Sequence, residues 1–290
     1  MTQAFIVPSD AEGLRRLMQQ ADADMAAGRL ADAEAALRAG LQFAPINPAC
    51  LRRLSQIAAH RAQWAAARDW AERAIAAGRD PWSHNQLGAV HLLAGELDAA
   101  EVAMQRMLSI FPNHVAALRR LSEIALRRGD PASAITWARR AAAAQPTHPG
   151  PLYQLSTAQI AAGDLDAAQA TTEQSLTLVP GHAPALRRLS DIALRRADQP
   201  GALVWAEKVV DAHPDDPWSH FQLATVRMAG GEFKEAEAAT LRMLARAPGH
   251  VAALRRLSDI ALRRGDTATA LSWARAAVEA APENPGTHYQ

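Results

Sequence analysis

The stretch PWSHNQLGAVHLLAGELDAAEVAMQRMLSIFPNH (81–114) decides the fold, because the whole chain repeats its pattern. Its apolar run ends at Gly95, helical spacing restarts at Glu96, and Pro112 closes the unit. Glycine ends helices and proline cannot continue them. The stretch therefore predicts a hairpin of two helices.

One alanine marks the repetition along the chain. It recurs at intervals of 33 or 34 residues, as Ala33, Ala67, Ala100, Ala134, Ala168, Ala202, Ala236 and Ala270. A period of this length is typical of small units that stack and cover one another's apolar faces. We therefore expect an all-α fold, a right-handed α-solenoid of helix-turn-helix repeats.

The repeat divides the chain into a lead-in, a solenoid and an incomplete copy. The lead-in is 1–13, and eight full copies occupy 14–47, 48–80, 81–114, 115–148, 149–182, 183–216, 217–250 and 251–284. A ninth copy begins at 285–290. These boundaries leave no room for a second fold, so we expect one elongated domain.

Composition narrows the class of protein. The 31 lysines and arginines nearly balance 30 acidic residues, so the chain has no overall attraction for nucleic acid or anionic lipid. Its single cysteine excludes an intramolecular disulfide. The sequence has no apolar stretch of membrane-spanning length, and its first residues, MTQAFIVPSD, have neither the basic region nor the apolar core that a signal peptide is expected to have. We expect a cytoplasmic protein that needs no cofactor.

Small residues at the eighth place of each copy predict how the two helices meet. That place holds Ala21, Ser55, Gly88, Ser122, Ser156, Ser190, Ala224 and Ser258. Such residues let the first helix approach the recurring alanine on the second, because the distance between helices depends on side-chain size at the crossing. Four of these serines follow the letters RRL, and we expect them to be buried rather than open to a kinase.

The pattern resembles the tetratricopeptide repeat family over almost the whole chain. Leu87, Gly88, Gly95, Ala100 and Pro112 stand at the spacing that this family uses. The large aromatic residue common at the family's fourth place is replaced by leucine or histidine in several copies, and Arg79 stands in place of one closing proline. The resemblance implies a non-catalytic scaffold whose first helices line a concave face and bind a protein or peptide there.

The copies alternate between two types, of which one is rich in arginine. At places where the resemblance implies partner contacts, this type carries Arg52, Arg119, Glu123, Arg127, Arg187, Asp191, Arg195, Arg255, Asp259 and Arg263. A spacing of four puts each later trio on one helical stripe. Two interpretations stay open: the acids pair with their flanking arginines, or surplus arginine leaves a positive groove that grips carboxylates or phosphates.

The other type of copy carries aromatic residues at the corresponding place. Its fifth place holds Asn85, Tyr153, Phe221 and Tyr289. If these line the groove, cationic and aromatic rungs alternate along it and suit an extended partner with acidic and apolar side chains. The alternative is that the rings pack between repeats. We expect Trp70, Trp137, Trp205 and Trp273 of the arginine-rich copies to fill the core.

No catalytic signature occurs in the chain, such as a glycine-rich phosphate loop, HExxH, CxxC or GxSxG. We therefore expect no enzyme activity and no metal site. The leading hypothesis is a scaffold for an extended, acidic partner segment. Because 285–290 opens a copy with nothing behind it, two alternatives remain: a recruitment or substrate-recognition module of a larger bacterial glycosyltransferase or sulfotransferase, and self-association through the C-terminal end.

Overall fold

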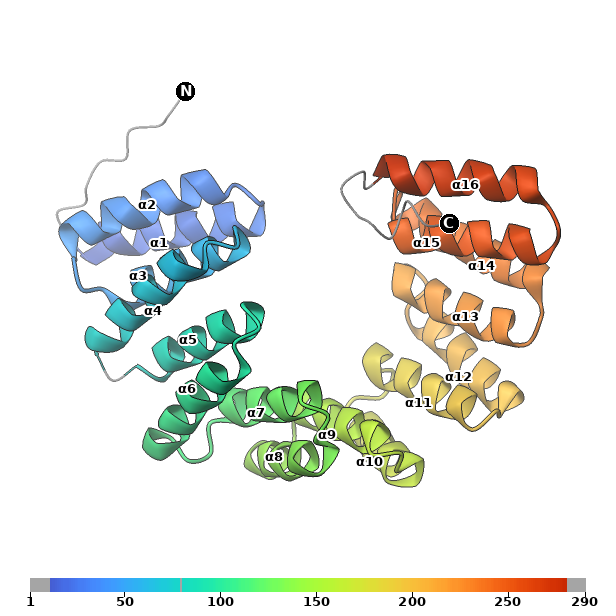
Figure 1. Cartoon of the computed structure of the whole chain (residues 1–290), viewed down its shortest axis with the longest axis horizontal. Helices are drawn as coiled ribbons and strands as arrows, with labels where there is room; N and C mark the ends of the chain where they lie inside the picture. The colour runs from blue at the N-terminus through green and yellow to red at the C-terminus, as the bar shows by residue number, and fades with distance from the viewer. Residues whose placement is uncertain (1–10, 79, 281–290) are drawn as a thin grey trace. The chain divides into compact units, whose positions relative to one another are not determined.

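The structure is a computed structural model that describes residues 11–78 and 80–280, and all of its regular elements there are α-helices. They are α1 (Ala11–Ala26), α2 (Leu30–Phe43), α3 (Pro48–His60), α4 (Trp64–Ala76), α5 (Pro81–Leu93), α6 (Leu97–Ile110), α7 (Val115–Arg127), α8 (Pro131–Ala144), α9 (Pro149–Ala161), α10 (Leu165–Leu178), α11 (Ala183–Arg195), α12 (Gln199–Ala212), α13 (Pro217–Ala229), α14 (Phe233–Arg246), α15 (Val251–Arg263) and α16 (Thr267–Ala280). Successive helices pair as hairpins, from α1 with α2 to α15 with α16 (Figure 1). The predicted all-α solenoid of helix-turn-helix repeats is confirmed. The predicted ninth copy, 285–290, lies outside the described residues.

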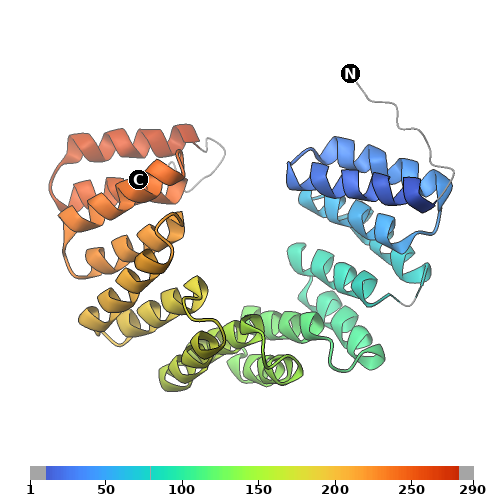
Figure 2. The same cartoon turned by 180° about the vertical axis from the view of Figure 1, so that it is seen from behind.

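The hairpins belong to two compact units, unit 1 from Met1 to Gln145 and unit 2 from Pro146 to Gln290. Within each unit, the second helix of one hairpin packs on the first helix of the next. First helices also pack together: α5 packs on α3 and α7, and α11 packs on α9 and α13. Figure 2 shows the same succession from behind. We call the surface formed by α1, α3, α5 and α7 of unit 1, or α9, α11, α13 and α15 of unit 2, the first-helix face.

The turn inside each hairpin requires a residue in the left-handed region. Six hairpins use glycine there: Gly28, Gly95, Gly129, Gly163, Gly231 and Gly265. The other two use Ala62 and Ala197, with φ of 55° and 58°. Alanine adopts this conformation at a cost that glycine avoids, because its Cβ crowds the following carbonyl. One such alanine occurs in each unit.

The recurring alanine lies where the two helices of a hairpin cross. All eight copies of it are buried. The eighth-place serine packs on it, and its hydroxyl donates a hydrogen bond to the alanine carbonyl, at 2.7 Å from Ser55 to Ala67 and 3.0 Å from Ser190 to Ala202. Ser122 and Ser258 are buried as well. The four serines that resemble kinase targets are thus inside the fold.

Gly88 shows how closely the helices approach. A Cβ on Gly88 would stand 2.1 Å from the terminal carbon of Met104. Unit 2 has Ala224 at the same place and the smaller Thr240 opposite it, and both are buried. A larger residue on one helix is therefore matched by a smaller residue on the other, as close packing requires.

The tryptophans of the arginine-rich copies are half-buried rather than fully enclosed. Trp70 and Trp137 pack against apolar core clusters of unit 1. The cation three residues later lies over each ring, Arg73 at 4.3 Å and Arg140 at 4.9 Å from the ring centroid. Each ring fills the core with one face and is shielded by a cation on the other.

Candidate functional site

Two arginines at the fifth place reach forward to the next hairpin. Arg52 Nη1 lies 2.7 Å from Asp80 Oδ2, and Arg187 Nη1 lies 2.6 Å from Asp216 Oδ2. All four side chains are half-buried. Burial lowers the pKa of Arg52, and the charge of Asp80 opposes this change. These two arginines are therefore engaged in ion pairs rather than free to bind a partner.

The same two aspartates cap the helices that follow them. Asp80 accepts a hydrogen bond from the backbone N–H of Trp82, and Asp216 accepts one from that of Trp218. Burial raises the pKa of Asp216, but the Trp218 N–H, Arg187 and Ser219 outweigh burial and hold it below its usual value. Each aspartate thus fixes the start of a first helix and the tryptophan at its second place.

Trp82 and Trp218 are large apolar side chains exposed on the first-helix face, at 55% and 48% of their full areas. The ring of Trp82 meets His114 edge-on at 5.6 Å, and that of Trp218 meets His250 at 5.1 Å. Both rings are thereby held in place while one side stays open to solvent. They were not among the predicted site residues, although the second place is one that the family resemblance names.

The sixth-place arginines reach back to the preceding hairpin. Arg120 Nε donates to Asn85 Oδ1 at 2.9 Å. Arg188 lies 4.1 Å from the ring centroid of Tyr153, and Arg256 lies 3.6 Å from that of Phe221. Tyr153 and Phe221 are thus each covered on one side by an arginine of the following hairpin. Tyr289 lies outside the described residues.

Burial lowers the pKa of two of these sixth-place arginines, but both stay protonated at neutral pH. It lowers the pKa of Arg120. It lowers the pKa of Arg256 to about 10, against the opposing charge of Asp259. Both guanidinium groups remain cationic, so each attracts the electron-rich partner that it covers.

The sixth place also reaches back in the copies that have glutamine there. Gln222 Nε2 donates to Asp191 Oδ1 at 2.8 Å and to Ser190 Oγ at 3.1 Å. Gln86 Nε2 donates to Ser55 Oγ at 3.2 Å. Asp191 is therefore tied to the next hairpin and not to its flanking arginines.

The ladder of acid and arginine forms in two of the predicted trios. Glu123 pairs with Arg127 at 2.7 Å, and Asp259 pairs with Arg263 at 3.2 Å. All four side chains are exposed to a large extent, so each pair contributes only a few tenths of a kcal/mol.

Three predicted arginines are exposed and have no partner within the part of the chain that the structure describes. Among the described residues, none forms an ion pair or hydrogen bond with the side chain of Arg119, Arg195 or Arg255. Arg119 lies on α7, the first helix after that of Trp82. Arg255 lies on α15, the first helix after that of Trp218. Each unit therefore presents a tryptophan and, one hairpin later, an unpaired cation.

A polar cavity of about 310 Å³ adjoins Trp82 on the first-helix face of unit 1. Its lining residues are Asp22, Arg52, Arg53, Gln56, Trp82, Asn85 and Gln86. Arg53 is held there by two hydrogen bonds to Asp22, at 2.5 and 2.7 Å. The cavity thus combines an aromatic wall with fixed polar groups, which suits a peptide backbone or a short polar side chain.

The described residues contain no group of three or more histidine, cysteine, aspartate or glutamate side chains placed to hold a metal ion. Among the same residues, every helix is too short or too polar to cross a membrane.

Family models described as tetratricopeptide repeat match residues 18–81, 91–160, 125–191 and 221–285. The chain belongs to the tetratricopeptide repeat family. Proteins of this family bind protein or peptide partners, and their repeats are in general non-catalytic. No curated protein matches the sequence.

Solved structures of other repeat proteins share the fold. A tetratricopeptide repeat protein from Parabacteroides merdae aligns over 95% of this chain and 96% of its own, with a TM-score of 0.59 and 14% identity. PilF from Pseudomonas aeruginosa aligns over 76% and 96%, with a TM-score of 0.54 and 18% identity. PilW, a type IV pilus biogenesis factor, aligns over 73% and 98%, with a TM-score of 0.59 and 15% identity. At these identities the likeness concerns the fold alone.

Proposed function

We propose that the chain is a non-catalytic scaffold that binds an extended protein or peptide segment along the first-helix face of each unit. The observation that carries this proposal is the matched pair Trp82 and Trp218. Both are exposed, both follow an aspartate cap, and both rest on a histidine of the next hairpin. Tryptophan is one of the residues in which the energetically dominant positions of protein interfaces are enriched.

Arg119 and Arg255 indicate which charge the partner segment should carry. Arg119 and Arg255 stand one first helix beyond Trp82 and Trp218, and no described residue neutralises them. Most other arginines on this face are already engaged by acids, rings or carbonyls. A segment with an apolar side chain over the tryptophan and an acidic side chain beyond it therefore fits best.

This partner is narrower than the one expected from the sequence. Arg52 and Arg187 act as supports for the tryptophans, because each holds the aspartate that caps the tryptophan's helix. Only Arg119, Arg195 and Arg255 offer a free guanidinium among the predicted arginines that the structure describes. Salt should weaken binding moderately, because few charges contribute to it.

Binding of the full chain to an array of capped twelve-residue peptides, which vary in acidic and apolar content, tests the proposal. We expect selection of peptides that contain both kinds of residue. Trp82→Ala combined with Trp218→Ala should weaken binding at least about tenfold, as loss of interface anchors does. Arg119→Glu combined with Arg255→Glu should abolish the preference for acidic peptides.

Arg139→Glu combined with Arg275→Glu is the matched control, because both residues are exposed arginines on second helices, α8 and α16. The control should bind as the natural chain does. Failure of the whole array, or equal losses in the control and the Arg119 and Arg255 variant, would contradict the proposal.

A further inference from the structure

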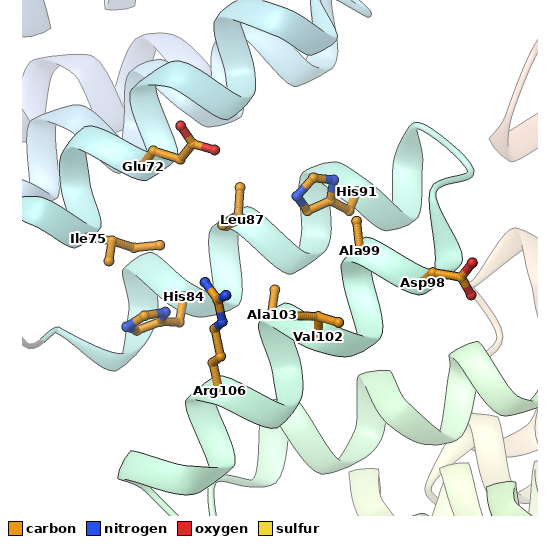
Figure 3. Close-up of a pocket in the computed structure, with 10 residues that line it drawn as sticks. All are labelled: Glu72, Ile75, His84, Leu87, His91, Asp98, Ala99, Val102, Ala103 and Arg106. Atoms are coloured by element: carbon orange, nitrogen blue, oxygen red, sulfur yellow. The ribbon is translucent and has the colours of Figure 1, made fainter.

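A second cavity, of about 510 Å³, lies in unit 1 between α4, α5 and α6. Two of these helices are second helices of their hairpins, so the cavity involves a different surface from the first-helix face. Figure 3 shows Leu87 of α5 in the centre, with Glu72 of α4 on one side and Arg106 of α6 on the other. Its volume is in the range of cavities that enclose small ligands or anchoring side chains.

The floor of this cavity is apolar and open to solvent. Ile75, Leu87, Val102 and Ala103 line it. Val102 exposes 48% of its area, which is large for an aliphatic side chain on a packed helix. Covering this surface would remove apolar area from water and thus favour binding.

Unit 2 has an arginine at the corresponding place. There Arg227 of α13 bridges Glu207 of α12, at 3.0 Å, and Glu232. In unit 1 the residue that corresponds to Arg227 is His91, which contacts Glu96 at 2.6 Å. The shorter side chain does not reach across, so Glu72, the counterpart of Glu207, has no ion-pair partner among the described residues.

A second difference between the two units concerns the other end of the cavity. His220 of unit 2 is 3% exposed, and its Nε2 lies 2.8 Å from the carbonyl oxygen of Pro214. Its counterpart His84 is only half-buried and lines the cavity. Six residues before His84 the sequence has Gly78, where unit 2 has Pro214 six residues before His220. The segment whose carbonyl contacts this histidine therefore differs between the two units.

The cavity has opposite unpaired charges on its two walls. Glu72 on α4 and Arg106 on α6 have no ion-pair partner among the described residues. Burial and the charge of Arg106 lower the pKa of His84, and Asp80 opposes them. Asp98 also lines the cavity but is engaged by Arg128 at 2.5 Å. Glu72 and Arg106 are thus the charges left to meet an occupant.

We propose that this cavity binds a short segment of a partner chain in which one or two large apolar side chains stand between a basic and an acidic residue. The apolar side chains cover Leu87 and Val102. The basic residue pairs with Glu72, and the acidic residue pairs with Arg106. This contact is separate from the one at Trp82, so either can fail without the other.

Nuclear magnetic resonance of the full chain tests the site with three capped tetrapeptides: Lys-Leu-Leu-Glu, Lys-Leu-Leu-Lys and Glu-Leu-Leu-Glu. We expect Lys-Leu-Leu-Glu to shift the methyl signals of Leu87 and Val102 and to bind at least about fivefold more tightly than the others, since each control places one like charge at a wall. Absence of a saturable shift up to about 5 mM, the range of weak single-site contacts, would overturn the proposal.

Two substitutions change the preference without removing any ion pair of the described residues. Glu72→Lys should make Glu-Leu-Leu-Glu the best ligand, and Arg106→Glu should favour Lys-Leu-Leu-Lys. His91→Arg should weaken all three peptides, because it restores the arginine that bridges the acids in unit 2. Glu207→Gln in unit 2 is the control and should leave binding unchanged. If both charge variants rank the three peptides by affinity as the natural chain does, the peptides do not contact Glu72 and Arg106 as proposed.

Discussion

The hairpin that begins with α5 in unit 1 and the one that begins with α13 in unit 2 are nearly the same on one side and different on the other. On the first-helix face, the aspartate cap, the exposed tryptophan and the histidine against its ring occur in both. On the side of α4 and α12, Arg227 bridges two acids in unit 2, whereas His91 of unit 1 contacts one.

The two hairpins therefore share one surface and differ at another. Each unit has the exposed tryptophan, the aspartate that caps its helix, the arginine paired with that aspartate and the histidine against the ring. We infer that this arrangement has the same role in both units. The place next to α4 differs from its counterpart at several residues, and in unit 1 it adjoins a cavity. A comparison of matched substitutions in the two units can therefore test which features are shared.

The largest expected effect concerns the crossing alanines. Ala100→Leu in unit 1 and Ala236→Leu in unit 2 should each lower the free energy of unfolding by about 1–3 kcal/mol, because both residues are fully buried at a helix crossing and the core would be overpacked. Urea unfolding monitored by circular dichroism measures both losses. A tolerated substitution in one unit alone would show that the crossings are not equivalent.

The aspartate caps should have the next largest effect. Asp80→Ala and Asp216→Ala should each cost about 1 kcal/mol, since a helix cap and a half-buried ion pair are lost together. Asp215→Ala is the control, because that side chain is almost fully exposed.

Acid should remove the contribution of Asp216. The pKa of this carboxyl is lower in the folded chain than in the unfolded chain, so its stabilisation is present above the unfolded pKa and is lost as the pH falls through the folded pKa. The difference in unfolding free energy between the natural chain and Asp216→Ala should therefore shrink below about pH 4. A difference that stays constant down to pH 2 would contradict this role, as pH 2 lies about two units below the usual aspartate pKa.

The smallest effect should be a gain in stability at the two alanine turns. Ala62→Gly and Ala197→Gly should each raise the free energy of unfolding by about 0.5–1 kcal/mol, because relief of the left-handed strain exceeds the entropy that glycine adds to the unfolded chain. Ala66→Gly within α4 is the control and should destabilise by a similar amount. Thermal unfolding midpoints compare the three, and a loss at both turns would show that the strain is unimportant.

The sequence was sufficient to predict the hairpin fold because a fixed period, the small eighth place and the recurring alanine all report on contacts inside one hairpin. The eighth-place serines and their burial followed from the same local pattern. Contacts between hairpins were harder to predict. A stripe of Arg187, Asp191 and Arg195 on one helix gives no sign that Asp216 or Gln222 of the next hairpin will engage two of its members.

The exposed tryptophans were missed for a related reason. In a helical sequence, a tryptophan is expected to fill a core, and only the orientation of its helix decides whether it does. The signal available in the sequence was that Trp82 and Trp218 stand at the second place of their copies, where the family resemblance implies partner contacts. The cavity beside Leu87 had no signal of its own, because the difference between His91 and Arg227 becomes visible only when the two units are compared.

The sixth-place side chains determine how such a protein can lengthen or shorten. An arginine there needs an amide, a ring or an acid on the hairpin before it, whereas a glutamine needs the serine of the arginine-rich type. Deleting one hairpin would bring two hairpins of the same type together and leave both kinds of junction mismatched. Growth and loss of this array are therefore expected to proceed by two hairpins at a time, and chimaeras should be joined at the same interval.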